Sequence, residues 1–264
     1  MKQRAFANSV QPNNIIFVAT EIFRTTFTEF VLKPNLLPDI FEQGTVLLLD
    51  KPYDWTSFDV VRKVRNQLKI KKVGHAGTLD PLATGLLILC TGKFTKMINE
   101  YMAREKEYTG SFTIGATTPT YDLESVPEDH VDISSITEDQ IYEATKSLTG
   151  DILQLPPMHS AIKKDGKRLY ELARKGLTVE LEPRPVNIKE FTITRIDFPL
   201  VYFRIVCTTG TYIRSIASDY GKILGCGAHL SNLCRTRIGE FFLRDAYSIE
   251  QVSEYIRSVK DQNG

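Results

Sequence analysis

The chain has 264 residues, 42% of them apolar and 25% charged, and its 33 Lys and Arg residues almost balance its 32 Asp and Glu residues, which leaves a net charge of +1. This composition fits one large globular domain and excludes a disordered chain. Taken as an average, the near-neutral charge also argues against nucleic acid as a partner, because proteins that bind it are usually basic.

Cysteine spacing and apolar runs indicate the compartment. The four cysteines, at positions 90, 207, 226 and 234, form no CxxC pair and have too few nearby histidines for a zinc site. Scattered thiols of this kind suit a reducing compartment. The apolar residues 15–19 are too few for a signal peptide, and no apolar run reaches the length of about 18 that a membrane-spanning helix needs. We therefore expect a cytoplasmic protein.

Regular structure is expected after an N-terminal extension over residues 1–42, to which we assign no role. Residues 46–49 form a continuous apolar run, which is typical of a strand buried on both faces. Thr56 and Asp59 fit a capping box that opens an amphipathic helix. A glycine-rich stretch then leads to a second buried strand over residues 86–90.

The rest of the chain favours more strands than helices. Residues 108–115 alternate with the period of a half-exposed strand. The further expected elements, in chain order, are a helix from Thr137 to about residue 148, a basic turn and helix over 163–175, strands near 186–197 and 200–208, a helix over 213–225, a strand over 235–244 and a last helix capped by Ser248 and Gln251. Adjacent pairs of strands favour an α+β fold with a mixed, largely antiparallel central sheet flanked by helices and loops.

The glycine-rich stretch reads GHAGTLDPLATG over residues 74–85. Its glycines predict a tight loop that another group approaches closely, and Pro81 holds Asp80 in extended backbone geometry. A carboxylate on such a rigid loop is a candidate catalytic group. The alternative is a turn aspartate that accepts hydrogen bonds from nearby backbone amides, which is a common role for this residue.

A nucleotide cofactor finds no support in the sequence. Thr91, Gly92 and Lys93 resemble the end of a phosphate-binding loop, but Phe94 stands where Ser or Thr must bind magnesium, and Leu87 stands where the first glycine is required. The dinucleotide-binding pattern GxGxxG does not occur either.

A second constellation is TGTYIRS over residues 209–215, where Arg214 follows Tyr212 at a turn that enters a helix. An arginine in this place can meet a carboxylate. A buried pair between Asp80 and Arg214 would keep the carboxylate ionised and fix its orientation. The alternative is a surface arginine on the first helical turn.

Positive charge gathers in three segments. Residues 60–77 hold six Lys and Arg and no acid, residues 163–175 hold six against two acids, and residues 204–238 hold five against one. One such segment is usually a solvated face. Three in one chain, with tyrosines and a histidine near them, favour a polyanionic partner.

Negative charge is concentrated as well. Residues 121–145 hold eight carboxylates and no Lys or Arg, so the other 239 residues carry 33 basic against 24 acidic side chains, a net charge of +9. The neutral total is therefore the average of a basic body and one acidic segment. We expect that segment to face away from a bound nucleic acid and from Asp80.

These motifs, in their order and spacing, resemble the bacterial tRNA pseudouridine-55 synthase family, the TruB type. The residues that carry the resemblance are GTVLLLDKP over 44–52, the loop over 74–85, KEY over 106–108, GTYIR over 210–214 and GCGAHL over 225–230. The resemblance covers about residues 40–250. It implies the pseudouridine synthase fold and the isomerisation of a uridine in the T-loop of tRNA, position 55, to pseudouridine, without a cofactor or a metal.

The resemblance also implies roles for single residues. Asp80 matches the essential catalytic aspartate, which attacks the ribose covalently or removes a proton from it, and Arg214 matches the arginine that pairs with this aspartate. Tyr108 matches the tyrosine that stacks on the target base. Tyr212 and Leu233 match residues that line the pocket.

Further residues match positions that support the loop or contact the tRNA. Lys51, counted among the substrate-binding residues, belongs to a Lys-Pro turn that supports the catalytic loop. His75 matches a histidine that lies against the T-loop when bases swing out of it, and its alternative is a core histidine. The expected tRNA-contact surface comprises residues 60–77 and 163–175. The second segment matches a family insertion that grips the T-arm, and its contact residues are Lys163, Lys164, Lys167 and Arg168.

The expected organisation is an extension over residues 1–42, a catalytic domain over 43–247, and a short C-terminal helix over 248–264 without a complete RNA-binding domain of the PUA type. We expect a monomer that binds the T-arm of tRNA, with no membrane and no protein partner. One alternative is a catalytically silent tRNA-binding or tRNA-folding protein on the same scaffold, which would have no need of Asp80, Tyr108 and Arg214 together. Another is a synthase with a different RNA target, as in the guide-RNA relatives, which the short chain without a basic tail disfavours.

Overall fold

The computed structural model of the protein describes residues 41–160, 162–164, 166–173, 176–177 and 179–261. The expected extension over residues 1–42 lies outside the described residues except for its last two positions. Among the described residues, no helix combines the length and the apolar composition that crossing a bilayer requires.

Nine strands of the described residues form one sheet in the order β1-β3-β10-β4-β9-β8-β5, with β2 paired to β3 and β11 paired to β10. Their bounds are Val46–Lys51 (β1), Val73–His75 (β2), Thr84–Thr91 (β3), Lys106–Ile114 (β4), Gly150–Gln154 (β5), Arg184–Asp197 (β8), Leu200–Cys207 (β9), Ala228–Ile238 (β10) and Phe241–Phe242 (β11). All the pairings are antiparallel except the one between β3 and β10. The predicted α+β fold with a mixed, largely antiparallel sheet is confirmed.

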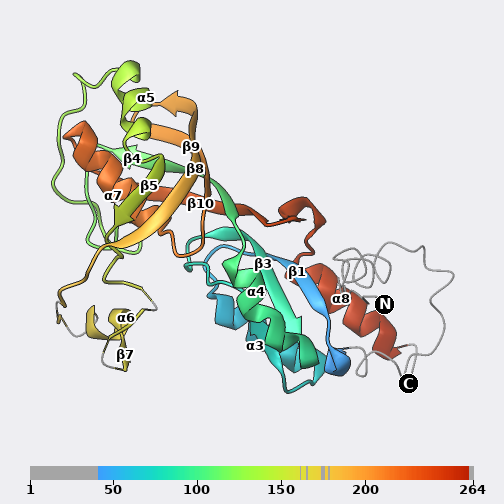
Figure 1. Ribbon diagram of the computed structural model, residues 1–264. Coiled ribbons are helices and arrows are strands. Elements are labelled where there is room, and N and C mark those ends of the chain that lie inside the picture. Colours follow the sequence, from blue (N-terminus) through green and yellow to red (C-terminus); the bar gives the residue numbers. More distant parts are fainter. Residues whose placement is uncertain (1–40, 161, 165, 174–175, 178, 262–264) are drawn as a thin grey trace, which may run out of the picture.

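Helices cover the sheet in two groups, which Figure 1 shows at its upper left and lower right. Helices α5 and α7 pack with β4, β8 and β9, whereas α3, α4 and α8 surround β1 and β3. Strand β10 runs from one group to the other. The helix bounds are Ser57–Leu68 (α3), Ile98–Ala103 (α4), Glu138–Lys146 (α5), Leu169–Ala173 (α6), Ile213–Leu224 (α7) and Ile249–Asp261 (α8).

Strands β1 and β3 are buried on both faces, as their continuous apolar runs predict. Leu49 and Leu87 point into the core formed with α3 and α8. Leu48 and Ile88 point to the other face, where they join Tyr101 of α4. These two strands therefore form a rigid base for the loop that leaves β2 and enters β3.

Local capping signals predict the helix ends correctly. Thr56 and Asp59 form a reciprocal capping box at α3, and Ser248 and Gln251 exchange two side-chain hydrogen bonds with each other's backbone amides at α8. Helix α7 ends where Gly225 adopts a φ of +74°, a left-handed conformation that glycine adopts without strain.

The expected strand over residues 235–244 is wrong in its extent. Strand β10 begins at Ala228 and ends at Ile238, and the chain then turns back through Gly239, whose φ is +54°, into the short strand β11. The glycine supports the left-handed conformation of this tight turn, so the apolar residues on either side of it form a hairpin.

The only parallel pairing among the described strands positions the candidate site. Cys234 and Arg235 of β10 lie beside Thr84 and Gly85 of β3. Gly85 has a φ of +100°, and a Cβ on it would lie 2.4 Å from the Arg235 carbonyl oxygen. Glycine at position 85 therefore permits β10 to pack directly against the end of the loop over residues 76–83.

Candidate active site

The loop between β2 and β3 presents Asp80, and its backbone is fixed on both sides of this residue. Before Asp80, the Ser57 hydroxyl at the start of α3 accepts a hydrogen bond from the Leu79 amide at 2.8 Å and donates one to the Leu79 carbonyl at 3.1 Å. After it, the Pro81 carbonyl accepts from the Asp54 amide at 3.0 Å. The carboxylate therefore stands on a loop with little freedom to move.

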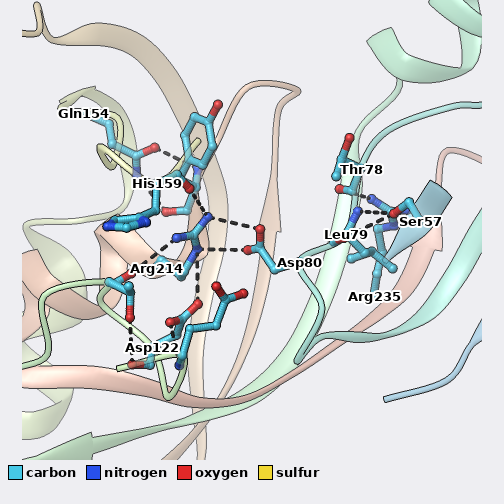
Figure 2. Close-up of polar contacts among 12 residues, drawn as sticks. Ser57, Thr78, Leu79, Asp80, Asp122, Gln154, His159, Arg214 and Arg235 are labelled. Atoms are coloured by element: carbon cyan, nitrogen blue, oxygen red, sulfur yellow. Dashed lines mark hydrogen bonds and ion pairs between the residues drawn. The ribbon is translucent and has the colours of Figure 1, made fainter. Parts of the chain in front are cut away.

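Arg214, in the first turn of α7, holds the Asp80 carboxylate (Figure 2). Its Nε lies 2.9 Å from Oδ2 and its Nη2 lies 3.0 Å from Oδ1, which is the bidentate geometry of a strong charge-assisted pair. The Arg214 side chain is 5% exposed, whereas 34% of the Asp80 side chain remains exposed. Asp80 is thus not a turn aspartate bound to backbone amides, and Arg214 is not a surface residue.

The Arg214 guanidinium has further acceptors close to it. Nη2 donates to the His159 carbonyl at 2.8 Å, Nη1 donates to the Thr120 carbonyl at 3.3 Å, and Nε lies 3.5 Å from Oδ2 of Asp122. Burial alone would lower the pKa of Arg214, but the Asp80 and Asp122 carboxylates outweigh it and raise that pKa above its ordinary value. The arginine is therefore a permanent cation in this site.

The expectation that the acidic segment over residues 121–145 faces away from Asp80 is wrong at the start of the segment. Asp122 is buried and shares Arg214 with Asp80, as Figure 2 shows. Its Oδ1 accepts a hydrogen bond from the Glu124 amide at 3.0 Å. A count of charges cannot separate one buried carboxylate from its exposed neighbours, since only the fold brings Arg214 to it.

Tyr212, directly before α7, is held through its backbone. The Gln154 side chain at the end of β5 accepts from the Tyr212 amide at 2.8 Å and donates to the Tyr212 carbonyl at 3.1 Å. Burial raises the pKa of Tyr212. The charges of Arg214 and Asp80 also act on this phenol, so Tyr212 lies near the Asp80–Arg214 pair.

Tyr108 and Leu233 lie in the same core cluster beside the site. Tyr108 on β4 and Leu233 on β10 are both buried and pack with Leu79 of the loop. Burial raises the pKa of Tyr108, and the nearby Arg235 guanidinium opposes the rise. Tyr108 therefore stays a neutral phenol at neutral pH.

Lys51 supports the Asp80 loop from inside the protein and does not face an open surface. Its side chain is fully buried, and the ammonium donates to the carbonyls of Pro81 at 3.1 Å, Pro52 at 2.9 Å and Trp55. Burial lowers its pKa to about 8, although the nearby Asp80 carboxylate opposes the shift. The ammonium is thus occupied by backbone, which fits the expected support of the loop and leaves no donor for direct contact with RNA.

His75 ends β2, at the entry to the loop, and is half-buried. Burial lowers its pKa, and the Arg235 charge lowers it further. The imidazole is therefore neutral at neutral pH. Its position at the start of the loop that carries Asp80 is compatible with contact to a substrate.

The basic residues expected to contact tRNA form a hairpin. Strand β6 (Lys163–Lys164) pairs with β7 (Lys167–Arg168) in an antiparallel register, and α6 follows directly. Figure 1 shows this unit projecting from the lower end of the lobe that contains β5 and α7. The side chains of these four residues lie outside what the structure describes.

Comparison with known families identifies the chain. A profile described as the TruB family pseudouridylate synthase N-terminal domain matches residues 65–213, more than half of the sequence. The chain belongs to the TruB family. A second profile, the tRNA pseudouridylate synthase B C-terminal domain, matches residues 214–263.

Curated TruB relatives match most of this chain. The tRNA pseudouridine synthase B of Flavobacterium johnsoniae is 50% identical over 229 residues, which are 84% of this chain and 100% of that protein. The tRNA pseudouridine synthase B of Chlorobaculum tepidum is 49% identical over 220 residues, 81% of this chain and 92% of that protein.

Solved structures share the fold of this TruB member. The crystal structure of a Cbf5-Nop10-Gar1 complex contains a chain that is 27% identical, with a TM-score of 0.66 over 88% of this chain and 59% of that one. An H/ACA RNP bound to a substrate RNA containing 2′-deoxyuridine gives 27% identity and a TM-score of 0.63 over 85% of this chain and 56% of that one. The expected pseudouridine synthase fold is confirmed.

Sequence reasoning missed four side chains that build this TruB site: Ser57, Asp122, Gln154 and Arg235. Each acts on backbone or on Arg214 from a distant part of the sequence. Arg235 belongs to the basic segment over residues 204–238, yet it is 1% exposed and therefore does not contribute to a basic surface. Among the described residues, no group of three or more His, Cys, Asp or Glu is placed to hold a metal ion.

Proposed function

We propose that this protein converts the uridine at position 55, in the T-loop of tRNA, to pseudouridine, with Asp80 as the catalytic residue. The observation that carries the proposal is the bidentate pair of Asp80 and Arg214 on a fixed loop of a TruB-family chain. The curated relatives are named for the same reaction class on tRNA.

The proposed reaction is an isomerisation, so it consumes no second substrate. The bond between N1 of uracil and C1′ of ribose breaks, the uracil turns, and a bond forms between C5 and C1′. The proton on C5 is lost and N1 gains one, which leaves the atoms and charge of the nucleotide unchanged. An ionised carboxylate beside the ribose can attack C1′ to form a covalent intermediate or remove a proton from C2′, and both routes begin from the same anion.

The geometry of the pair suits this chemistry. Arg214 binds both Asp80 oxygens and is buried, so it holds the anion and fixes its orientation. The carboxylate keeps 34% of its side chain exposed, which leaves it accessible to a ribose. Substrate would therefore reach the aspartate while the arginine stays behind it.

Aromatic side chains supply the surroundings that a flipped uracil needs. Tyr108 is proposed to stack on the target base, with Tyr212 and Leu233 lining the pocket. A base extruded from a folded loop loses its stacking at a cost of a few kcal/mol, which contact with aromatic and apolar side chains offsets. His75 stands at the start of the protein loop that carries Asp80. It is proposed to contact the T-loop of the tRNA after the target base has left it.

Binding of the T-arm is assigned to the basic segments over residues 60–77 and 163–175, through contacts to phosphates and to the shape of the RNA. Lys163, Lys164, Lys167 and Arg168 lie on the β6–β7 hairpin, which projects from the lobe that carries Arg214. We further propose that the protein acts as a monomer in the cytoplasm. Light scattering with and without tRNA would check the monomer.

The experiment that tests the function is pseudouridine mapping of unmodified tRNA after incubation with the purified protein. Signal at the T-loop uridine supports the proposal, and its position separates this family from synthases with other RNA targets. Tight tRNA binding without pseudouridine in any product would instead establish the catalytically silent tRNA-binding protein. A uridine-to-cytidine change at the target position is the matched control, because it should abolish the signal.

A further inference from the structure

A second arginine, Arg235, lies buried under the loop that carries Asp80. Its Nε donates to the Leu86 carbonyl at 2.7 Å, Nη2 donates to the Gly77 carbonyl at 3.1 Å, and Nη1 lies 3.5 Å from the Thr78 carbonyl. Its side chain is the largest of those that are fully buried in the described part of the chain. Figure 2 shows it on the opposite side of the loop from Arg214.

These contacts join the two ends of one segment. Gly77 and Thr78 precede Asp80 in the loop, whereas Leu86 follows it in β3. A planar guanidinium with donors on several edges can bridge carbonyls that point toward it from different directions. Arg235 therefore fixes the span within which Asp80 must stand.

The cost of this arrangement indicates a purpose beyond core packing. Burying a cation requires full hydrogen bonding or an opposite charge. Within the residues that the structure describes, no carboxylate forms an ion pair with Arg235, so backbone carbonyls and the Tyr108 phenol satisfy it. An apolar side chain such as methionine would fill much of this volume without burying a charge, but the carbonyls of Leu86, Gly77 and Thr78 would lose the donors that fix them.

The strand register ties Arg235 to the site as well. On β10 it stands between Gly85 of β3 on one side and Tyr108 of β4 on the other. The Arg235 charge opposes the burial that raises the pKa of the Tyr108 phenol, and it adds to the burial that lowers the pKa of the Lys51 ammonium. One side chain thus backs both the loop that presents the carboxylate and the ring proposed to stack on the base.

We propose that Arg235 is a positioning residue, which keeps the Asp80 carboxylate where Arg214 can hold it and the ribose can reach it. This inference rests on the proposed pseudouridine synthase function. Arg235 touches no substrate, so its loss acts on the rate of the chemical step and not on tRNA affinity. A misplacement of a reacting group by about 1 Å can cost about 100-fold in rate, and we expect a loss of about that size.

The test compares Arg235→Met and Arg235→Lys with the wild type in single-turnover pseudouridine formation at saturating protein. The dissociation constant for tRNA and the melting temperature are measured on the same preparations, and rates are taken well below the melting temperature. Arg237→Met is the matched control. Arg237 lies on the same strand and is 19% exposed, but it donates to Glu105 and Gly239, away from the loop.

We expect Arg235→Met to lower the single-turnover rate constant by about 100-fold with an unchanged dissociation constant, and Arg237→Met to leave the rate near that of the wild type. Arg235→Lys should recover part of the rate, because it keeps the charge but not the planar fork. If Arg235→Met does not fold, Arg235→Lys carries the test. A folded variant with the wild-type rate would show a purely structural role and overturn the inference, whereas an inactive wild type would overturn the proposed function itself.

Discussion

Arg214 and Asp80 stand 134 positions apart in the sequence, yet the guanidinium of one meets both carboxylate oxygens of the other at 2.9 and 3.0 Å. The loop between β2 and β3 supplies the carboxylate, and the first turn of α7 supplies the guanidinium. These elements belong to the two groups of helices and strands that β10 joins. The site therefore exists only when both halves of the sheet are in register.

Removal of the Asp80 charge is the most direct test of the catalytic assignment. Asp80→Asn keeps the shape of the side chain and a hydrogen-bonding oxygen but supplies neither a nucleophile nor a base. Pseudouridine formation should fall below detection, while tRNA binding, measured by filter retention, stays within a few-fold of the wild type.

A control variant separates this effect from a general loss of surface charge. Asp54 is exposed, lies in the turn that contacts Pro81 through its backbone, and has a φ of +61°, which asparagine tolerates. Asp54→Asn should keep nearly full activity. Activity of Asp80→Asn at more than a small fraction of the wild type would remove Asp80 from its catalytic role.

Stability should depend on Arg214 through Asp122, which shares it with Asp80. Asp122 is 5% exposed, so Arg214→Met leaves a buried carboxylate without its cation. Breaking a buried ion pair in this way destabilises a protein by about 3 to 5 kcal/mol. Chemical denaturation of Arg214→Met should show a loss in this range, together with loss of pseudouridine formation.

A double variant distinguishes the stability role of the arginine from its role in the reaction. Arg214→Met combined with Asp122→Asn removes the unpaired charge. The double variant should therefore recover part of the free energy of unfolding that Arg214→Met loses. Activity should not return, because Asp80 still lacks its partner. Strictly additive losses of stability in the two single variants would show that Arg214 and Asp122 do not interact.

Much of this fold could be predicted from local patterns, because those patterns act locally. The apolar runs of β1 and β3, the capping box at Thr56 and the glycine at the end of α7 each determine the structure of their own segment. The pairing of β3 with β10 could not be predicted in this way. It joins residues about 150 positions apart in the chain, since Thr84 donates to the Leu233 carbonyl at a separation of 149, and no periodicity records such a contact.

The same limit applies to the site. Asp80 and Arg214 were recognisable because each stands in a distinctive motif. Asp122 and Arg235 stand among other charged residues of the same sign, so sequence alone groups them with an acidic segment expected to face away from Asp80 and with one of three basic segments that favour a polyanionic partner. Both are buried, and a count of charges along the chain does not reveal that.

The rate of the reaction should fall at alkaline pH as Lys51 loses its proton. Burial lowers the pKa of Lys51 to about 8, and the neutral amine has one donor fewer for the three carbonyls that it binds. The loop beside Asp80 then loses a support. The single-turnover rate constant should decline with an apparent pKa of about 8.

Stability should change in the opposite direction over the same range. Because the pKa of Lys51 in the folded protein lies below its ordinary value of 10.5, the unfolded chain binds this proton more tightly. The Lys51 contribution to the free energy of unfolding therefore rises between about pH 8 and about pH 10.5. If the rate constant falls while the Lys51 contribution to the free energy of unfolding does not, the cause is a displaced Asp80 loop and not unfolding.

Two variants assign this pH dependence to Lys51. Lys51→Met should be slow and independent of pH through the same range. Lys106 is also buried with a pKa lowered by burial to about 8, but its ammonium binds the carbonyls of Met102 and Arg104, away from Asp80. Lys106→Met should keep the decline of the wild type. A decline that survives in Lys51→Met would contradict the assignment.

Neutralisation of the β6–β7 hairpin should weaken tRNA binding and its dependence on salt. Each lysine that contacts a phosphate releases counterions on binding, so its loss lowers the slope of the logarithm of the association constant against the logarithm of salt concentration by about 0.7 to 0.9. Replacing Lys163, Lys164 and Lys167 with glutamine should therefore reduce the slope by about 2 to 3. The single-turnover rate at saturating protein should stay near that of the wild type.

The matched control removes the same three charges elsewhere. Lys146, Lys189 and Lys222 each pair with a carboxylate on the surface, on α5, β8 and α7. Their replacement with glutamine changes the net charge by the same amount, so a long-range effect of charge alone would weaken binding equally in both triple variants. A slope that changes only in the hairpin variant locates the phosphate contacts on β6 and β7, and an unchanged slope in that variant would remove the hairpin from the tRNA-binding surface.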